Sequence, residues 1–295
     1  MRKLNLKIPP HDNLIMWLKF VSKNIHLYKE YNSLTIDFGI TEFLGTDELV
    51  LLASFIEVFY HNDCEINFEG GSYKLISHLN NIRLKEYWTD GFNRSDYTES
   101  KNSSTLCLWK IHPQMSFYYS IYAQKFYESF TNNKDLLSIA SNMDEVFNNI
   151  FDHSRSPDWN NGYIMTQYLP NINKLEFSIC DFGIGIANCI RESKLFKIEE
   201  SERDSDLILK SLKAGFSVKS NPKNKGMGLH YISDLANTSN GFLTIASNKG
   251  LYRKFIGGRE SLVNLPVNFE GTLIKLRVDL STFEEKETEE YLFDF

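Results

Sequence analysis

Hydrophobic residues recur along this chain with two different periods, and the alternation between them predicts its first elements. Helical spacing runs over Asn13–Tyr31, and a second, strongly apolar helix is expected over Asp47–Tyr60 with Thr46 as its N-cap. Short runs rich in β-branched residues, Ser33–Phe38 and Glu65–Phe68, predict strands. Because strand and helix alternate, we expect a small α/β domain with parallel strand pairing over residues 1–95.

A polar stretch without an apolar period, residues 90–104, follows, and we interpret it as a linker or loop. Beyond it we expect a second domain over residues 105–282 and an acidic, loosely held tail over 283–295. The expected strands are Thr105–Ile111, Gly162–Leu169, Leu175–Cys180, Gly241–Ala246, Leu251–Ile256 and Thr272–Val278. The expected helices are Tyr73–Leu79, Phe117–Phe130, a helix from near Asp135 through Ser154, and Gly228–Leu235, while Arg191 to about Lys225 is expected to be charged and irregular.

The helix through Asn142–Ser154 is predicted to have two chemically different faces. Its apolar stripe consists of Leu136, Ile139, Ala140, Met143, Val146, Phe147 and Ile150. The other face carries Glu145, Asn149 and His153 at i, i+4 and i+8. A solvated face is one interpretation, but asparagine and aspartate are poor helix formers that contribute little if they only meet water. A functional face is the other interpretation.

A glycine-rich turn is expected directly after the strand Leu175–Cys180, in the sequence Asp181-Phe182-Gly183-Ile184-Gly185-Ile186. This pattern places a carboxylate at the mouth of a pocket, where glycine lets the backbone approach a ligand closely. A dinucleotide-binding fingerprint would need a third glycine at Asn188. A protein kinase would need HRD and VAIK motifs before its DFG triplet, and the sequence has neither. An ordinary two-glycine turn remains the alternative.

Two further glycine motifs follow. Lys225-Gly226-Met227-Gly228-Leu229 precedes a predicted helix, and free backbone N–H groups at a helix start can bind phosphate. Lys219 and Lys223 add positive charge nearby, although glycine at a helix start is common. Gly271-Thr272 precedes the last predicted strand.

Taken in order, the motifs of residues 105–280 resemble the GHKL ATPase superfamily, which includes gyrase, histidine kinases and the anti-sigma-factor serine kinases. The resemblance rests on Glu-x-x-x-Asn on a helix, Asp-x-Gly-x-Gly after a strand, Gly-x-Gly-Leu entering a helix, and Gly-Thr at a strand. It implies an α+β two-layer sandwich of the Bergerat ATP-binding type with ATP and Mg²⁺ as cofactors. The layout is closest to the anti-sigma-factor kinases.

The resemblance also implies roles for individual residues. Glu145 matches the general base that polarises the attacking water or hydroxyl, and Asn149 matches the residue that holds magnesium against the triphosphate. Asp181 matches the acceptor of the adenine amino group, and Thr272 the hydroxyl near adenine. Ala187 to Lys225 would form a lid. The remaining nucleotide-binding positions implied are His153, Gly183, Gly185, Ile186, Lys225, Gly226, Met227, Gly228 and Leu229.

The first 95 residues more weakly resemble a STAS domain, the fold of anti-sigma-factor antagonists. The similarity rests on Ile36-Asp37-Phe38, on Phe43-Leu44-Gly45-Thr46-Asp47 before a long helix, and on Ile66-Asn67-Phe68. Those antagonists carry a phosphorylatable serine just before the helix. Here Thr46 would accept phosphate or cap the helix, and Asp47 at the acceptor position would make the site permanently acidic.

Composition narrows the class of protein. With 295 residues and 42% hydrophobic residues the chain can build substantial cores, and a formal charge of −6 gives no indication of nucleic-acid binding. Cys64, Cys107, Cys180 and Cys189 lack metal-ligand spacing and predict reduced, mostly buried thiols. The start of the chain lacks the apolar run of a signal peptide, and Leu49–Ile56 is too short to span a bilayer. We expect a cytoplasmic protein without membrane association.

Three functional hypotheses follow. The first is an ATPase or serine/threonine kinase in partner-switching regulation, with a regulatory protein as partner and a homodimer among the compatible assemblies. The second is a nucleotide-gated interaction module with negligible turnover, in which ATP orders the lid for partner docking. The third is a scaffold with a degenerate site.

Overall fold

The computed structural model describes residues 2–89, 91–92, 104–106, 108–112, 116–131, 134–154, 162–193, 195–199, 201–216 and 228–286, without the side chains of residues 116, 145, 148–154 and 228. Its helices are α1 (Leu14–Asn24), α2 (Thr46–His61), α3 (Tyr73–Asn81), α4 (Ser116–Glu128), α5 (Leu137–Ser154), α6 (Ile186–Ser193), α7 (Asp204–Ser211) and α8 (Gly228–Thr238). Its strands are β1 (Lys3–Lys7), β2 (Ser33–Asp37), β3 (Glu65–Glu69), β4 (Trp109–Ile111), β5 (Gly162–Leu169), β6 (Lys174–Asp181), β7 (Phe242–Lys254) and β8 (Glu260–Asp279). Short 3₁₀ helices include η1 (Ile25–Lys29) and η2 (Lys85–Trp88).

Residues 3–69 contain a three-stranded parallel sheet in the order β1-β2-β3, which confirms the expected alternation of strand and helix with parallel pairing. The strand β1, with the sequence KLNLK, was not anticipated because its alternation of leucine with polar residues is short. Leu34 and Ile36 of β2 are fully buried toward the helices. Parallel strands need crossover connections, and α1 and α2 supply them here.

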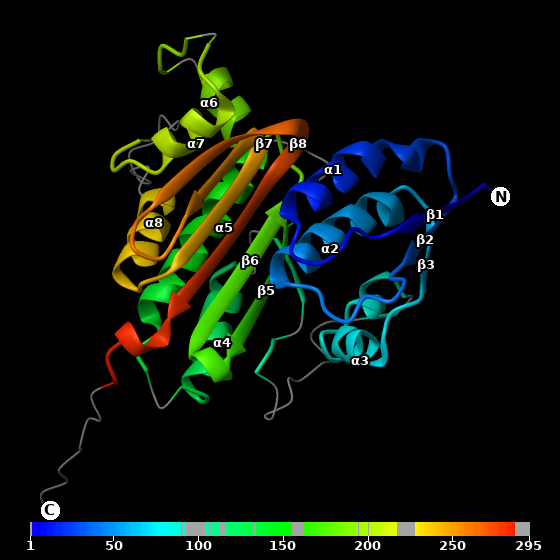
Figure 1. Cartoon of the computed structure of the whole chain (residues 1–295), viewed down its shortest axis with the longest axis horizontal. Helices are drawn as coiled ribbons and strands as arrows, with labels where there is room; N and C mark the ends of the chain where they lie inside the picture. The colour runs from blue at the N-terminus through cyan, green and yellow to red at the C-terminus, as the bar shows by residue number, and fades with distance from the viewer. Residues whose placement is uncertain are drawn as a thin grey trace, which may run out of the picture.

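The second sheet has five antiparallel strands in the order β4-β5-β6-β8-β7. Figure 1 shows α4, α5 and α8 on one face of this sheet and α1 and α2 on the other. The chain is therefore a mixed α/β protein, as expected for the fold class.

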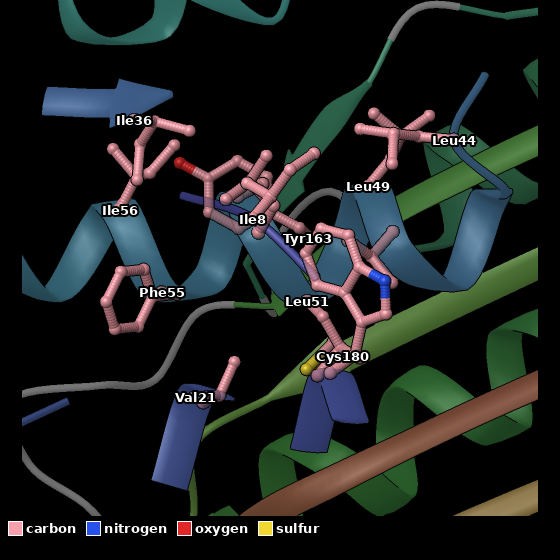
Figure 2. Close-up of a cluster of buried hydrophobic side chains, with 14 of the residues drawn as sticks. Ile8, Val21, Ile36, Leu44, Leu49, Leu51, Phe55, Ile56, Tyr163 and Cys180 are labelled. Carbon is pink, nitrogen blue, oxygen red and sulfur yellow. The ribbon is translucent and has the colours of Figure 1, made fainter. Parts of the chain in front are cut away.

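Helix α2 lies between the two sheets. Thirteen of its residues are buried, including every position from Glu48 to Phe59. A helix that is apolar on all sides is favoured only where neighbours cover it all round. Figure 2 shows how one core results: Phe55 and Leu51 of α2 lie with Ile36 of β2 and with Tyr163 and Cys180 of the five-stranded sheet.

The central strand β6 is buried on both faces. Its odd-numbered apolar residues, Leu175, Phe177 and Ile179, pack into the core beneath α4, α5 and α8. Cys180 faces the core around α2. Because neighbouring side chains of a strand alternate between its faces, Asp181 at the end of β6 points to the α5 side.

Three local expectations are wrong. Gly241–Ala246 and Leu251–Ile256 are one strand, β7, which continues through a register shift between Asn248 and Gly250. The expected strand Thr105–Ile111 is reduced to β4 and an isolated bridge from Thr105 to Gln167. The segment from Arg191 onward is not irregular throughout, because α7 packs on β7 with Leu207 and Ile208 fully buried.

The expected helix cap at Thr46 is also wrong. The N-cap of α2 is Gly45, whose N–H donates to the Glu48 carboxylate at 2.8 Å. Thr46 is the first helical residue and is fully buried. Its hydroxyl donates to Glu176 of β6 at 2.6 Å and lies 2.7 Å from the hydroxyl of Ser178. Thr46 thus attaches α2 to the second sheet.

Other expectations concern the cysteines, the membrane and the tail. Cys64, Cys180 and Cys189 are free and buried, as predicted, and Cys107 lies outside the described residues. In the described part of the chain no helix combines the length and apolarity that crossing a membrane requires. The proposed linker falls mostly on residues that are not described, as does the tail after residue 286. The domain boundaries stay a prediction.

Candidate functional site

A buried polar cluster lies at one end of β6 and β8, where Asp181 and Thr272 are direct partners in the antiparallel register. The backbone N–H and the hydroxyl of Thr272 both donate to the Asp181 carboxylate. A third donor is the backbone N–H of Gly183, 2.6 Å from Asp181 Oδ1. Asp181 is only 3% exposed. These contacts fix the carboxyl group on the α5 side of the sheet.

Burial raises the pKa of Asp181 to about 7 from its usual value of 3.8. The hydrogen bonds from Gly183 and Thr272 oppose this rise without cancelling it. Among the described residues, the groups that act on this carboxyl include no basic side chain. A buried carboxyl with no counter-ion is unfavourable for stability, and such perturbed groups are concentrated at functional sites.

Two glycines near Asp181, Gly185 and Gly271, are required by the geometry. Gly185 has a φ of +81°, and a Cβ there would lie 2.5 Å from the side-chain oxygen of Asn248. Gly271 has a φ of +137°, and a Cβ there would lie 2.1 Å from the backbone oxygen of Asp181. Neither position can hold a larger residue without moving the chain. The Asp-x-Gly-x-Gly and Gly-Thr motifs therefore meet at one place in the fold.

Two residues of β7 complete the cluster, and sequence reasoning missed both. The Ser247 hydroxyl accepts from the backbone N–H of Ile186 at 2.8 Å and donates to the Gly271 oxygen at 2.6 Å. The Asn248 side chain donates to the Ile184 oxygen at 2.9 Å and accepts from the Asn188 N–H at 3.3 Å. The sequence feature that could have identified these two residues is the polar Ser247-Asn248 pair, which interrupts an apolar strand. Together these contacts hold the start of α6 and the glycine turn against the sheet.

Helix α5 crosses the face of the sheet that carries Asp181. Its predicted stripe is buried at Leu136, Ile139, Ala140, Met143, Val146 and Phe147, which confirms the amphipathic interpretation for these residues. Glu145, Asn149 and His153 lie on this helix, but their side chains are outside the described part of the structure, as is that of Ile150. The predicted base and magnesium ligand are therefore located by backbone only.

The second glycine motif is described only in part. Lys225, Gly226 and Met227 lie outside the described residues, as do Lys219 and Lys223. Gly228 is the first residue of α8, and Leu229 packs partly buried on the α5 side of the sheet. Helix α8 therefore begins where the motif predicts. A role for its N-terminus in phosphate binding stays a prediction.

The segment expected to form a lid contains two helices in its described part. Gly250 lets α7 approach β7 closely, because a Cβ there would lie 2.7 Å from both Ile208 Cδ1 and the Ser205 backbone nitrogen. Asp204 accepts from the Lys249 N–H at 2.8 Å and pairs with Arg191 of α6. These contacts hold residues 204–211 against β7.

No cluster of three or more His, Cys, Asp or Glu side chains suitable for holding a metal ion occurs within the described residues. The predicted magnesium ligand Asn149 falls outside that search. The donor set described at the cluster, one carboxyl with hydroxyl and amide groups, suits a hydrogen-bonding organic ligand better than a metal cage.

No family model matches the sequence, and no curated protein matches it.

Proposed function

We propose that the protein binds Mg-ATP in a GHKL-type site and acts as an ATPase or serine/threonine kinase in partner-switching regulation. The observation that carries this proposal is the buried Asp181 carboxyl at the end of the central strand, held by Thr272 and Gly183 beside a turn that only glycine can form. Such a group is suited to accept a hydrogen bond from the exocyclic amine of adenine.

The packing of α5 supports the proposal. Met143, Val146 and Phe147 of α5 share one core with Ile179 and Ile274. Ile179 and Ile274 each lie two residues from a member of the polar cluster, on the same face of their strands. The helix that carries Glu145 and Asn149 therefore lies on the face of the sheet where Asp181 is found.

Within this proposal each residue has a separate task. Asp181 and Thr272 bind the adenine ring of the nucleotide. Asn149 contributes an oxygen ligand to Mg²⁺, and Glu145 orients and deprotonates the attacking water or hydroxyl. Magnesium, when bound, would neutralise charge on the phosphates. Phosphoryl transfer depends mostly on the positioning of the reacting groups and on this kind of charge neutralisation. Because Asp181 is 3% exposed, nucleotide entry requires a movement of the groups that cover it.

The binding step is tested by isothermal titration of ATP with magnesium into wild type, Asp181→Asn and Asp279→Asn. Asp279 is a matched control, since it lies at the opposite end of β8 and is half-exposed. We expect binding to wild type and Asp279→Asn, and a loss of at least about tenfold in Asp181→Asn, corresponding to one charge-assisted hydrogen bond. Equal affinity in all three proteins would exclude Asp181 from the site.

The catalytic step is tested with radiolabelled ATP on wild type and Glu145→Ala. Hydrolysis or phosphate transfer that depends on Glu145 supports the enzyme. Tight binding without turnover in either protein supports the nucleotide-gated interaction module instead. If neither protein binds ATP, both forms of the proposal are wrong.

A further inference from the structure

One face of α4 presents large apolar side chains to solvent. Phe117 is 67% exposed and Tyr118 is 60% exposed, and Ile121, one turn further along the helix, is half-buried. Lys125 follows at the next turn and is exposed. Because residues three or four positions apart share a helix face, these four side chains form one surface, which we call the α4 surface. Contiguous exposed apolar surface often marks a place where another segment or protein binds.

The last described residues of the chain reach one end of the α4 surface. The backbone N–H of Asp135 donates to the Glu284 oxygen at 2.9 Å, which holds this part of the chain against the connection between α4 and α5. Lys286 then donates to the Glu128 carboxylate at the end of α4, at 2.7 Å. The Glu128 side chain is only 10% exposed, and it lies one turn after Lys125 on the same helix face. The chain is therefore attached directly beside the α4 surface at Lys286.

The segment that follows, residues 287–295, has a composition complementary to the α4 surface. Its sequence is ETEEYLFDF. The first part carries three glutamates, and the second part supplies Tyr291, Leu292, Phe293 and Phe295. The α4 surface has the same order when it is followed from Glu128 toward the start of the helix, with the cation of Lys125 first and the aromatic rings after it.

The distances match this order. Phe117 lies about 16 Å from Glu128 along the axis of α4, from the rise per residue of a helix. Residues 287–291 span about 17 Å when the chain is extended. A segment that runs back along α4 from Lys286 thus brings its glutamates past Lys125 and its apolar residues to the exposed rings.

We propose that residues 287–295 bind the α4 surface of their own chain, with Tyr291, Leu292 and Phe293 against Phe117 and Tyr118. The same chain is the occupant because Lys286 already lies at the end of the surface, and a short tether gives an effective concentration in the millimolar range. The tail that the sequence predicts to be loosely held is thereby a docked segment, and while docked it excludes a partner protein from this surface. The interaction involves no residue of the Asp181 cluster and does not depend on ATP.

A fluorescein-labelled peptide with the sequence of residues 286–295 is the probe, and anisotropy measures its binding to the full chain. The tail variant Tyr291→Ser/Phe293→Ser is compared with wild type, because its own tail no longer competes with the peptide. We expect saturable binding to the tail variant and binding at least about tenfold weaker to wild type, whose surface is already occupied. Equal affinity for the two proteins, or binding to neither, would overturn the proposal.

Further substitutions in the tail variant locate the peptide. Phe117→Ala/Tyr118→Ala removes the exposed rings but keeps good helix formers, and it is expected to weaken peptide binding about tenfold or more. Ile172→Ala/Ile256→Ala, which truncates two side chains that are each 52% exposed elsewhere, is the matched control and should bind the peptide normally. Circular dichroism verifies that both proteins are folded. Equal peptide affinity in the two folded proteins would place the segment elsewhere and overturn the assignment.

The role of charge is tested separately with Lys125→Glu in the tail variant. This change is expected to weaken peptide binding severalfold, because the glutamates of the segment then meet a like charge. Lys19→Glu, at an exposed lysine of α1, changes the net charge equally and should leave the affinity near that of the tail variant. A loss of the same size in both would overturn the placement of the glutamates at Lys125.

Sedimentation velocity of wild type identifies whose tail occupies the surface. A monomer over the concentration range of the titration supports docking within one chain. A dimer that forms with rising concentration and is abolished in the tail variant would assign the surface to the tail of a second copy, and would overturn the proposal in its present form.

Discussion

Asp181 accepts hydrogen bonds from both the backbone N–H and the hydroxyl of Thr272, its direct neighbour across β6 and β8. This pairing joins two motifs that lie far apart in the sequence. The carboxyl is held in place by donors that satisfy it, yet burial still keeps its pKa raised to about 7.

Asp181→Asn is expected to change how stability depends on pH. The pKa of Asp181 is about 7 in the folded chain and 3.8 ordinarily, so the folded state binds more protons between these values and loses stability as pH rises. This loss in the free energy of unfolding is absent below pH 3.8 and complete above about pH 7, where it amounts to roughly 4 kcal/mol. Urea unfolding from pH 4 to 8 should therefore show a decline in wild type that is reduced in the variant. Parallel curves for the two proteins would contradict the assignment.

Nucleotide affinity is expected to rise with pH through the same window. An ionised Asp181 is the stronger acceptor for an amino group, and about 7 is the pKa of the free site. Adenosine, which lacks the titrating phosphates of ATP, should bind up to about tenfold more tightly at pH 8 than at pH 6. Asp181→Asn should remove the pH dependence. A dependence of the same size in the variant would assign it to another group.

Thr46→Val is expected to destabilise the attachment of α2 to the second sheet. The change keeps the shape of a fully buried side chain but removes the donor to Glu176 and the contact with Ser178. We expect a loss of about 1–3 kcal/mol in the free energy of unfolding, measured with urea. Thr35→Val, at a half-exposed threonine of β2, should change it by less than about 0.5 kcal/mol. The burial of Thr46 also predicts that a kinase does not phosphorylate it in the folded chain.

Gly271→Ala is expected to lower the free energy of unfolding by about 3 kcal/mol or more. The Cβ of the alanine would overlap the Asp181 backbone, and the backbone conformation at this position is one that residues with a side chain rarely adopt. Gly258→Ala is the matched control. Gly258 has a φ of +81° but no atom within 4 Å of its Cβ position. It should therefore show only the conformational cost, about 1–2 kcal/mol. Equal thermal shifts for the two variants would mean that the chain relaxes around Gly271 without penalty.

Local patterns predicted much of the fold. The spacing of apolar residues located α2, α5 and β6 to within a few residues, because period 3.6 and period 2 are properties of the chain itself. The helix expected over Asn13–Tyr31 begins as predicted, but α1 ends at Asn24 and the 3₁₀ helix η1 follows it. The sequence also indicated that Asp181 ends a strand and enters a glycine turn. The predicted apolar stripe of α5 is buried for the same reason, because residues spaced at the helical period lie on one face of the helix.

Other features depended on residues far apart in the chain. The cap of α2 could not be assigned from Gly45-Thr46, since the hydroxyl of Thr46 is taken by Glu176, 130 positions away. Similarly, the length of β7 exceeds that of its two apolar runs because β8 pairs with it across the register shift at Asn248. Such contacts have no local signature.

The sequence by itself determined most of the helices and strands, because these follow from side-chain periodicity. The roles it assigns to Glu145, Asn149 and Asp181 stay predictions. Only the tertiary structure decided that Ser247 and Asn248 complete the cluster around Asp181, and that Lys286 lies against Glu128 at the end of α4. The reason is physical. Burial, and with it the pKa of Asp181, depends on which distant side chains exclude water from a group, and that exclusion exists only once α2, α5 and both sheets are packed together.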